Sequence, residues 1–369
     1  MSYRPLSAVV MAAGEGKRMK SSRPKPLHVL CGRPMLLHVL DALAHVPACR
    51  IVVVVGHGAE RVTKALQHEG PPEVDLDFVE QHSPRGTGDA VSVALTAFPD
   101  DDLDSDDLIV LPGDTPLLQP STLLSLIRHH RRTDAAATVL TARVPDPTGY
   151  GRVLRDKDGR VQAIVEEADA SGDERQIDEV STSVFCFRRS LLAPALRRLS
   201  PENAQGEYYL PDVIGVLHDA GYPVHPVLAD DWADTAGVND RVQLAAAEAV
   251  LRDRINRRWM GEGVTMVDPA HTYVDAGVRL ASDVTLFPGT MLSGRTVVGS
   301  GARIGPDARL VDCVVGPGAV VEHTVGSDAE IGRDARVGPF AFLRPGSHVA
   351  EGATTGPFYT GRAGDEDGL

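Results

Sequence analysis

The sequence predicts an α/β domain with a mainly parallel sheet, followed by a parallel β-helix. Over roughly the first 230 residues, short apolar runs alternate with amphipathic segments, a pattern typical of βαβ units. From residue 280 onward, an aliphatic residue recurs at six-residue spacing, which is the period of a β-helix. The chain has 369 residues, more than one ordinary domain holds, so at least two domains are expected.

The first part contains four predicted strands and several predicted helices. The run at 51–55 consists only of Ile and Val, which indicates a parallel strand covered on both faces. Ligands of such sheets bind at the carboxyl ends of the strands, so the loops at 14–25 and 113–117 are candidate binding loops. The predicted strands are residues 8–11, 51–55, 74–78 and 108–111, and the predicted helices are residues 34–43, 89–97 and 121–130.

A long helix is expected from residue 240 to residue 259, between the two parts. Its larger apolar residues lie on one face at spacings of seven and four residues, the last being Trp259. Glycines at 261 and 263 end the pattern, so this segment is predicted to link the two domains.

Regularly spaced aliphatic residues define the second part. We expect each to fill the interior of a coil, and the glycine that follows several of them to permit a tight corner. Coincidental strands are the alternative, and eleven positions in phase argue against it. The series is Leu280, Leu286, Leu292, Val298, Ile304 and Leu310, then, after an interruption, Val325, Ile331, Val337, Leu343 and Val349.

Composition and charge exclude several classes of protein. Hydrophobic residues make up 43% and charged residues 24%, which predicts a packed core and not a disordered chain. No apolar run approaches the roughly 18 residues of a membrane-spanning helix. The net charge of −14 argues against nucleic acid or an anionic membrane as a partner. The start of the chain does not resemble a secretory signal, and the four cysteines form no C-x-x-C pair, so a cytoplasmic protein without zinc or disulfides is expected.

Basic charge is concentrated in one loop after the first predicted strand. Three of the five lysines, Lys17, Lys20 and Lys25, lie there together with Arg18 and Arg23. Glycines in this loop would let backbone N–H groups approach phosphates or base edges, and the cationic side chains suit a polyphosphate. The loop matches neither the dinucleotide-binding fingerprint nor a P-loop. We therefore expect a small polyanion such as a nucleotide, with a solvated structural turn as the alternative.

A family resemblance extends this prediction. The segment from Met11 to Met19, with Pro24 and Lys25 after it, resembles the nucleotide-binding signature of sugar-1-phosphate nucleotidylyltransferases. Further matches follow in family order: Gln81 with Gly86-Thr87-Gly88, Gly113-Asp114-Thr115-Pro116-Leu117, Gly149-Tyr150-Gly151-Arg152, Val165-Glu166-Glu167, residues 203–210, and Gly237-Val238-Asn239-Asp240-Arg241. With the repeat behind them, the chain resembles the bacterial bifunctional UDP-N-acetylglucosamine pyrophosphorylase/glucosamine-1-phosphate acetyltransferases. This implies a Rossmann-like transferase fold followed by a left-handed β-helix.

The resemblance also implies a role for each matched residue. Arg18 and Lys25 would be catalytic and would stabilise the triphosphate and the leaving pyrophosphate. The remaining implied contacts are Ala13, Gly14, Gln81, Gly86 and Thr87 for the uracil of UTP, Gly151, Glu166 and Ser181 for the sugar of a sugar 1-phosphate, and Asp114 and Asn239 for a magnesium ion. Magnesium prefers oxygen ligands and commonly uses only one or two protein groups. The implied reaction joins UTP and N-acetylglucosamine 1-phosphate into UDP-N-acetylglucosamine, a cell-envelope precursor, with release of pyrophosphate.

Several of these residues have structural alternatives. Asp114 could close a turn, Asn239 could cap the helix that follows, and Glu166 with Glu167 could be a solvated pair. The six aspartates of residues 100–107 lack the glycine and glutamate of a calcium loop, so a solvated loop is predicted there.

Four positions depart from the family pattern. Lys17, Asp89, Ala168 and Ser181 stand where the family has threonine, histidine, lysine and asparagine respectively. Because that asparagine touches the sugar in the family, Ser181 leaves the sugar identity open. After Arg344, the later acetyltransferase residues of the family have no match, so we expect no acetyl-CoA chemistry.

The predicted organisation has four parts. Residues 1–239 form the nucleotidylyltransferase domain, 240–262 the linker helix, 263–356 a truncated β-helix, and 357–369 a disordered acidic tail. The resemblance implies a homotrimer through the β-helix. Two alternatives to the main functional prediction remain: the same reaction on a different sugar 1-phosphate, or a non-catalytic paralogue that binds nucleotide sugar or acts as a scaffold.

Overall fold

The computed structural model describes residues 4–72, 75–98 and 106–361. The chain divides into two compact units, one within Met1–His28 and Pro34–Leu244, the other within Val29–Arg33 and Ala245–Leu369. Across the described residues, no helix combines the length and the apolar character needed to cross a membrane.

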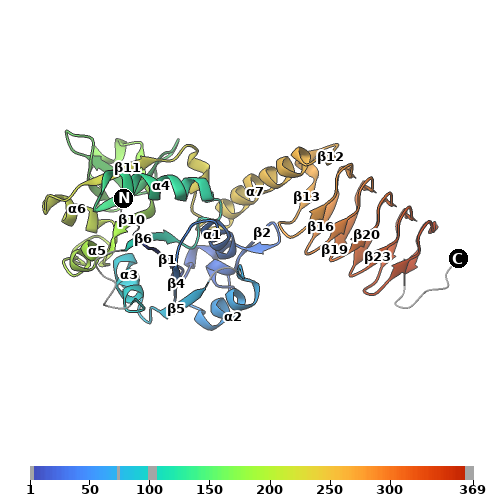
Figure 1. The fold of residues 1–369 in the computed structure, drawn as a ribbon, viewed down its shortest axis with the longest axis horizontal. Coiled ribbons are helices and arrows are strands. Elements are labelled where there is room, and N and C mark those ends of the chain that lie inside the picture. The colour runs from blue at the N-terminus through green and yellow to red at the C-terminus, as the bar shows by residue number, and fades with distance from the viewer. Residues whose placement is uncertain (1–3, 73–74, 99–105, 362–369) are drawn as a thin grey trace. The chain divides into compact units, whose positions relative to one another are not determined.

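A nine-stranded sheet forms the centre of the first unit (Figure 1). Its strands are β1 (Leu6–Met11), β4 (Arg50–Val55), β5 (Leu76–Glu80), β6 (Asp107–Pro112), β7 (Ala137–Arg143), β8 (Arg152–Arg155), β9 (Val161–Val165), β10 (Glu179–Arg188) and β11 (Val224–Leu228). The main path runs β11-β7-β10-β6-β1-β4-β5, and β8 joins it through β10 and carries β9. Only β10 runs antiparallel to its neighbours along this path, so the mainly parallel sheet is confirmed.

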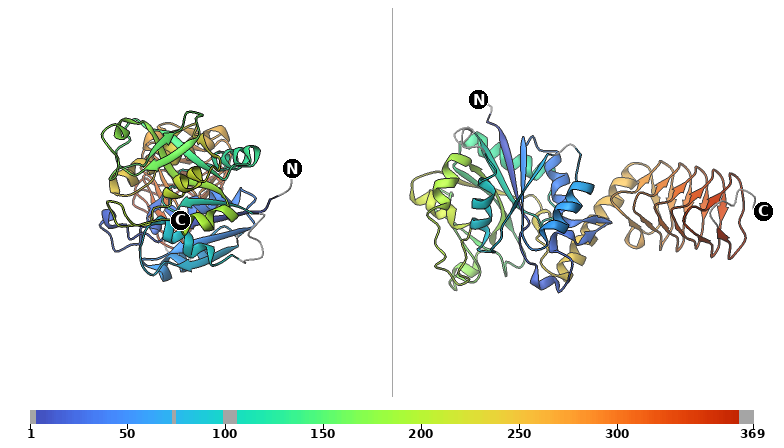
Figure 2. Two further views of the ribbon diagram at one scale, coloured as in Figure 1. Left: turned by 90° about the vertical axis from the view of Figure 1, so that its left-hand side faces the viewer. Right: turned by 90° about the horizontal axis from the view of Figure 1, so that it is seen from below.

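Helices cover both faces of this sheet (Figure 2). They are α1 (Met35–Ala44), α2 (Ala59–Glu69), α3 (Thr87–Leu95), α4 (Pro120–Thr133), α5 (Arg189–Leu196) and α6 (Asp212–Asp219). The first, second and fourth pack on one face, and the other three on the opposite face. Alternate residues of β1 enter the two cores, Ala8 on one side and Val9 on the other, which explains its unbroken apolar run.

The strand order creates a crevice at the carboxyl ends of β1 and β6. The chain passes from β1 outward to β4 and β5, then returns to place β6 on the other side of β1. At such a reversal the loops after the two central strands diverge and leave room for a ligand. The loop after β1 carries two short helices, η1 (Lys17–Met19) and η2 (Lys25–Leu27).

The predicted long helix is α7 (Arg241–Gly261). Ile255 and Trp259 are buried, in agreement with the predicted apolar face, and Gly263 follows in the left-handed conformation. Part of the helix, β2 (Val29–Leu30) and the first residue of β3 (Arg33–Pro34) belong to the second unit.

Three parallel sheets form the coils of the second unit (Figure 1). The first contains β12 (Thr265–Met266), β15 (Thr285–Leu286), β18 (Arg303–Ile304), β21 (Val320–Val321) and β24 (Arg336–Val337). The second contains β13 (Tyr273–Val274), β16 (Met291–Ser293), β19 (Arg309–Val311), β22 (Val325–Ser327), β25 (Phe342–Leu343) and β27 (Thr360–Gly361). The third contains β14 (Arg279–Leu280), β17 (Val297–Val298), β20 (Val314–Val315), β23 (Glu330–Ile331) and β26 (His348–Val349). The predicted α/β domain followed by a left-handed β-helix is confirmed.

One position of the six-residue series was predicted wrongly. Ten of its eleven residues are buried, but Val325 is 46% exposed. The inward position belongs to Gly326, which pairs with Leu310 and Leu343 of the neighbouring coils. A Cβ at Gly326 would lie 3.2 Å from Leu310 Cδ2, so glycine fits where a larger residue would crowd. The apparent interruption is a shortened side of the coil, since Val315 takes the inward position five residues after Leu310.

Two predicted loops also need correction. Thr360–Gly361 pairs with β25, so the predicted disorder from residue 357 is wrong for this strand, while 362–369 lie outside the described residues. For the solvated loop predicted at 100–107, residues 100–105 also lie outside the described residues. Asp106 and Asp107 are buried and not solvated, because Asp107 begins β6 and its carboxylate accepts a hydrogen bond of 2.8 Å from Arg131.

Candidate active site

A cavity of about 700 Å³ lies at the carboxyl end of β1 in the first unit. All twelve residues predicted for the site line it: Ala13, Gly14, Arg18, Lys25, Gln81, Gly86, Thr87, Asp114, Gly151, Glu166, Ser181 and Asn239. The structure therefore brings the predicted residues together, while the role of each remains a prediction.

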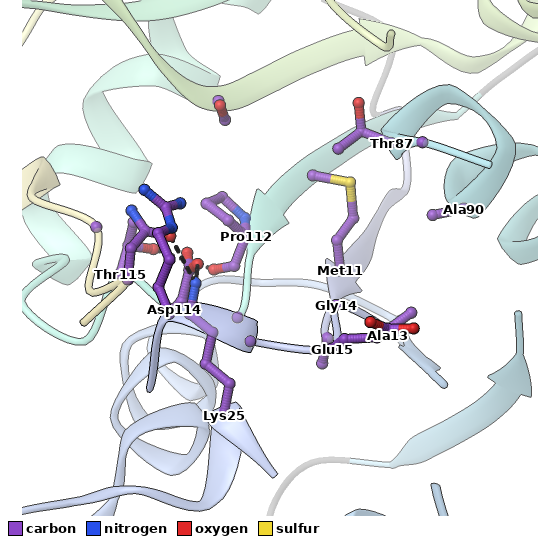
Figure 3. A pocket seen from close by; sticks show the side chains of 18 of the residues that line it. Met11, Ala13, Gly14, Glu15, Lys25, Thr87, Ala90, Pro112, Asp114 and Thr115 are labelled. Atoms are coloured by element: carbon purple, nitrogen blue, oxygen red, sulfur yellow. Dashed lines mark hydrogen bonds and ion pairs between the residues drawn. The ribbon is translucent and has the colours of Figure 1, made fainter. Parts of the chain in front are cut away.

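Lys25 is the central cation of the cavity. Its Nζ donates a hydrogen bond to Asp114 Oδ2 (Figure 3). It donates a second hydrogen bond, of 2.8 Å, to Asn239 Oδ1. Gly16 makes this position possible: it has φ +65°, and a Cβ there would lie 2.6 Å from Lys25 Cβ. A side chain at residue 16 would therefore displace the lysine.

Backbone contacts hold Asp114 and Asn239 side by side. The N–H of Val238 donates to the carbonyl oxygen of Asp114 at 2.9 Å, and Asn239 N–H donates to Gln243 Oε1 at 2.7 Å. Asn239 does not cap α7, because the Asp240 carboxylate accepts from the N–H groups of residues 242 and 243. The Asn239 side chain is thus available to the cavity.

The oxygens of Asp114 and Asn239 converge on one cationic atom, the Lys25 ammonium. A carboxylate and an amide oxygen are ligands that magnesium accepts. Within the described ranges, no cluster of three or more His, Cys, Asp or Glu side chains could hold a metal. These two residues therefore suit a cation that takes its other ligands from phosphate and water.

Two further cations of the β1 loop differ in their pairing. Lys17 forms an ion pair of 2.8 Å with Glu15, which raises the pKa of Lys17 and lowers that of Glu15. Arg18 is exposed, lines the cavity and forms no ion pair with any described residue. Its guanidinium is therefore available to an anionic ligand.

The opposite end of the cavity is formed by α3 and the segment that packs against it. Figure 3 shows Thr87 and Ala90 across Met11 from Lys25 and Asp114. The Thr87 hydroxyl accepts a hydrogen bond of 2.9 Å from the N–H of Leu210. Gly86 has φ +108°, and a Cβ there would lie 2.5 Å from the carbonyl oxygen of Tyr208. Thr87 and Gly86 thus also hold residues 203–210 against the helix.

Gly151, Glu166 and Ser181 line a third region of the cavity. A Cβ on Gly151 would lie 3.3 Å from Glu166 Oε1, so glycine allows the close approach of this carboxylate. Ser181 donates its N–H to Gly151 O at 2.8 Å, just before a β-bulge in β10. Bulges of this kind re-aim side chains next to binding sites.

Glu166 and Glu167 do not form a solvated pair. Glu167 forms an ion pair of 2.6 Å with Arg152. The pKa of Glu166 is raised by burial and then by the nearby charges of Asp212 and Asp169. Burial, assisted by Asp169, raises the pKa of Asp212 to about 6.

Tyr209 lies beside these carboxyl groups. Burial and its acidic neighbours, Asp169 first, raise its pKa to about 12. Its hydroxyl is buried and has no hydrogen-bond partner among the described residues. Glu166, which lines the cavity, is thus surrounded by further acidic groups and by a tyrosine hydroxyl without a hydrogen-bond partner among the described residues.

Sequence reasoning missed several residues of the cavity wall, among them Thr148, Thr235 and Gln243. Gln243 lies at the start of α7, where nothing in the sequence sets it apart from a solvent-facing helical residue. Its contact with Asn239 depends on how the preceding loop turns back toward β6.

Comparison with known proteins agrees with this arrangement. Residues 8–220 match the family model of the MobA-like NTP transferase domain. The chain is 45% identical over 352 residues to the bifunctional protein GlmU of Desulfitobacterium hafniense, covering 95% of this chain and 75% of that protein. Proteins of the same name from Streptomyces avermitilis and Mycolicibacterium vanbaalenii are 46% and 48% identical over 97% and 96% of this chain, which spans 73% and 72% of their lengths.

The three relatives match 95% to 97% of this chain. Identity above 40% over some 95% of the chain is accompanied by the predicted two-part fold and by a cavity that contains every predicted residue. The chain belongs to the GlmU family, and its first unit is a nucleotidyltransferase domain of the MobA-like type.

Proposed function

We propose that the chain is a magnesium-dependent uridylyltransferase that joins UTP and N-acetylglucosamine 1-phosphate into UDP-N-acetylglucosamine and releases pyrophosphate. The observation that carries the proposal is the ammonium of Lys25 between the oxygens of Asp114 and Asn239, at the strand ends of a nucleotidyltransferase domain. In this arrangement one ammonium group lies between two oxygen atoms that could bind a metal. A nucleoside triphosphate and its metal would replace these contacts.

The reaction requires positioning and charge neutralisation more than covalent catalysis. A phosphate oxygen of the sugar 1-phosphate attacks the α-phosphorus of UTP, a new O–P bond forms, and the bond to the β-phosphate oxygen breaks. Pyrophosphate leaves with the electron pair of that bond. Lys25, released from Asp114, and Arg18 neutralise the charge that develops on the leaving group.

Asp114 and Asn239 would hold the magnesium ion. When bound, the ion supplies charge neutralisation to the phosphate oxygens of UTP. Ala13, Gly14, Gln81, Gly86 and Thr87 would bind the uracil, and Gly151, Glu166 and Ser181 the sugar. These assignments are supported by the shared cavity and by family membership.

Pyrophosphate release from UTP tests the proposal. We would measure it with and without magnesium, with N-acetylglucosamine 1-phosphate, glucosamine 1-phosphate, glucose 1-phosphate and galactose 1-phosphate. Magnesium-dependent release that is fastest with N-acetylglucosamine 1-phosphate is expected. A preference for another sugar would support the alternative that Ser181 motivates, and no release with any sugar would contradict the enzymatic proposal.

Absence of acetyl transfer and formation of a trimer remain separate predictions. Free thiol release from acetyl-CoA in the presence of glucosamine 1-phosphate measures the first, and the mass in solution from light scattering measures the second. Neither result changes the expected pyrophosphate release, because the proposed cavity lies wholly within the first unit.

A further inference from the structure

The side chain of Gln81 is held in one orientation by two acceptors. Gln81 follows β5, is 8% exposed and lines the cavity at the α3 end. Its Nε2 donates to Asp89 Oδ2 at 2.7 Å and to Gly86 O at 3.2 Å. Asp89 belongs to the first turn of α3.

The chemistry of the two acceptors fixes which amide atom faces the cavity. A carboxylate and a backbone carbonyl only accept hydrogen bonds, so the NH₂ group of Gln81 must point toward them. Both of its N–H groups are then used. Oε1 has no hydrogen-bond partner among the described residues, so it is the atom left to meet a ligand.

An outward-facing carbonyl oxygen selects bases by their hydrogen-bond polarity. Uracil and thymine carry an N3–H donor that such an oxygen can accept, whereas cytosine presents an N3 lone pair that it repels. A freely rotating glutamine amide could turn its NH₂ group outward and bind cytosine as well. The Asp89 carboxylate makes that rotation unfavourable, because it would face the Gln81 oxygen with another acceptor.

We propose that Asp89 is a positioning residue for base selection: it fixes the Gln81 amide so that the cavity accepts a pyrimidine with an N3–H donor and rejects cytosine. This inference rests on the proposed function insofar as the α3 end of the cavity holds the base.

A purely structural role for Asp89 predicts different behaviour. An acidic residue in the first turn of a helix stabilises that helix through the backbone dipole. If that were its only role, Asp89→Asn would lower the melting temperature without changing the choice of base. Asp89→Asn keeps the shape of the side chain but can offer its NH₂ group to the Gln81 oxygen, so it permits both orientations of the amide.

The test measures kcat and KM for pyrophosphate release with UTP, CTP and N3-methyl-UTP. Wild type and Asp89→Asn are compared with Ser92→Ala, an exposed residue of the same helix that serves as the control. We expect the UTP-to-CTP ratio of kcat/KM to fall about tenfold in Asp89→Asn, through KM and with little change in kcat. The ratio of UTP to N3-methyl-UTP should fall in parallel, and Ser92→Ala should behave like wild type.

A Gln81→Ala background tests whether Asp89 acts through Gln81. In that background, Asp89→Asn should cause no further change in the base ratio. An unchanged ratio in the folded Asp89→Asn variant, or an equal change in the Gln81→Ala background, would overturn the inference.

Binding measurements separate this inference from the proposed reaction. If the wild type releases no pyrophosphate from UTP, the proposed function fails, and calorimetric titration with UTP and CTP still reports base selection. If the wild type prefers UTP and the Asp89→Asn variant shows a smaller preference, the positioning role is supported even without turnover. Equal binding of both nucleotides, or binding of neither, would contradict it.

Discussion

Two ends of the cavity handle charge in opposite ways: the proposed phosphate end, formed by Lys25, Asp114 and Asn239, and the proposed sugar end, formed by Gly151, Glu166 and Ser181. At the phosphate end, the Lys25 ammonium is paired with Asp114 and hydrogen-bonded to Asn239. Beside the sugar end, burial raises the pKa of both Glu166 and Asp212; the charges of Asp212 and Asp169 add to the shift of Glu166, and that of Asp169 adds to the shift of Asp212. Neither carboxylate has an ion-pair partner among the described residues. One end is electrostatically satisfied without a ligand, and the other is not.

This difference indicates how each end would respond to its ligand. At the phosphate end, a ligand would replace the contacts of Lys25 with Asp114 and Asn239 by contacts of its own. Its affinity therefore depends on how well the new contacts compensate for those that are lost. At the sugar end, hydroxyl or amide donors of a ligand would supply hydrogen bonds that Glu166 lacks, because this carboxylate lines the cavity and has no hydrogen-bond partner among the described residues. Substitutions at the two ends should therefore affect different kinetic constants.

Removal of the lysine at the phosphate end should have the largest effect. Lys25→Ala removes the charge that would stabilise the leaving pyrophosphate, and we expect kcat/KM for pyrophosphate release to fall about 100- to 1000-fold. Lys64→Ala, on the exposed side of α2, is the matched control and should stay near wild type. Activity of Lys25→Ala within threefold of the wild type would show that this end does not hold the reacting phosphates.

At the sugar end, loss of one carboxylate should change sugar affinity selectively. Glu166→Gln keeps the shape but weakens hydrogen bonds to sugar hydroxyls, so KM for the sugar 1-phosphate should rise about 10-fold or more. KM for UTP should stay constant, which steady-state kinetics with each substrate varied in turn will show. Glu202→Gln, on the exposed surface, provides the control. A rise in KM for UTP of similar size would remove the distinction between the two ends.

The sequence predicts the β-helix and the loop after β1 well, because both depend on local patterns. A six-residue period places most inward positions without knowledge of the fold. The period failed at Val325, because one side of the coil has five residues instead of six and the inward position falls on Gly326. No local feature of the sequence indicates this shortening. Likewise, Gly16 and Lys25 belong to one continuous loop, and their close contact follows from glycine's access to positive φ.

The sugar end was harder to predict because its properties come from distant segments. Glu166 follows β9, whereas Asp212 begins α6, and only the packing of that helix on β9 brings their charges close. The prediction of a solvated loop was wrong at Asp107 for a similar reason, since this residue is buried through its contacts with Arg131 and His130 of α4. The contact between Gln81 and Asp89 lies between these two cases. The two residues are close in sequence, but their side chains meet only because α3 begins between them.

The smallest expected effect is on stability, and it concerns Asp212. Its pKa of about 6 lies above the ordinary value of 3.8, so the folded state binds this proton more tightly than the unfolded state. The contribution of this proton to the free energy of unfolding is complete below about pH 4 and is lost as the pH rises through 6. Because the carboxyl is partly exposed, we expect a loss of only about 1 kcal/mol, equivalent to about 2–4 °C in Tm.

Asp212→Asn should remove this pH dependence. The amide stays neutral, so the variant should melt about 2–4 °C above the wild type at pH 8 and close to it at pH 4. Thermal unfolding at both pH values measures the difference, and Asp173→Asn, a substitution at an exposed aspartate, is the control. A variant that gains nothing at pH 8 would mean that Asp212 ionises freely in the folded protein. The sugar end would then be as well compensated as the phosphate end, and the contrast between them would rest on hydrogen bonding alone.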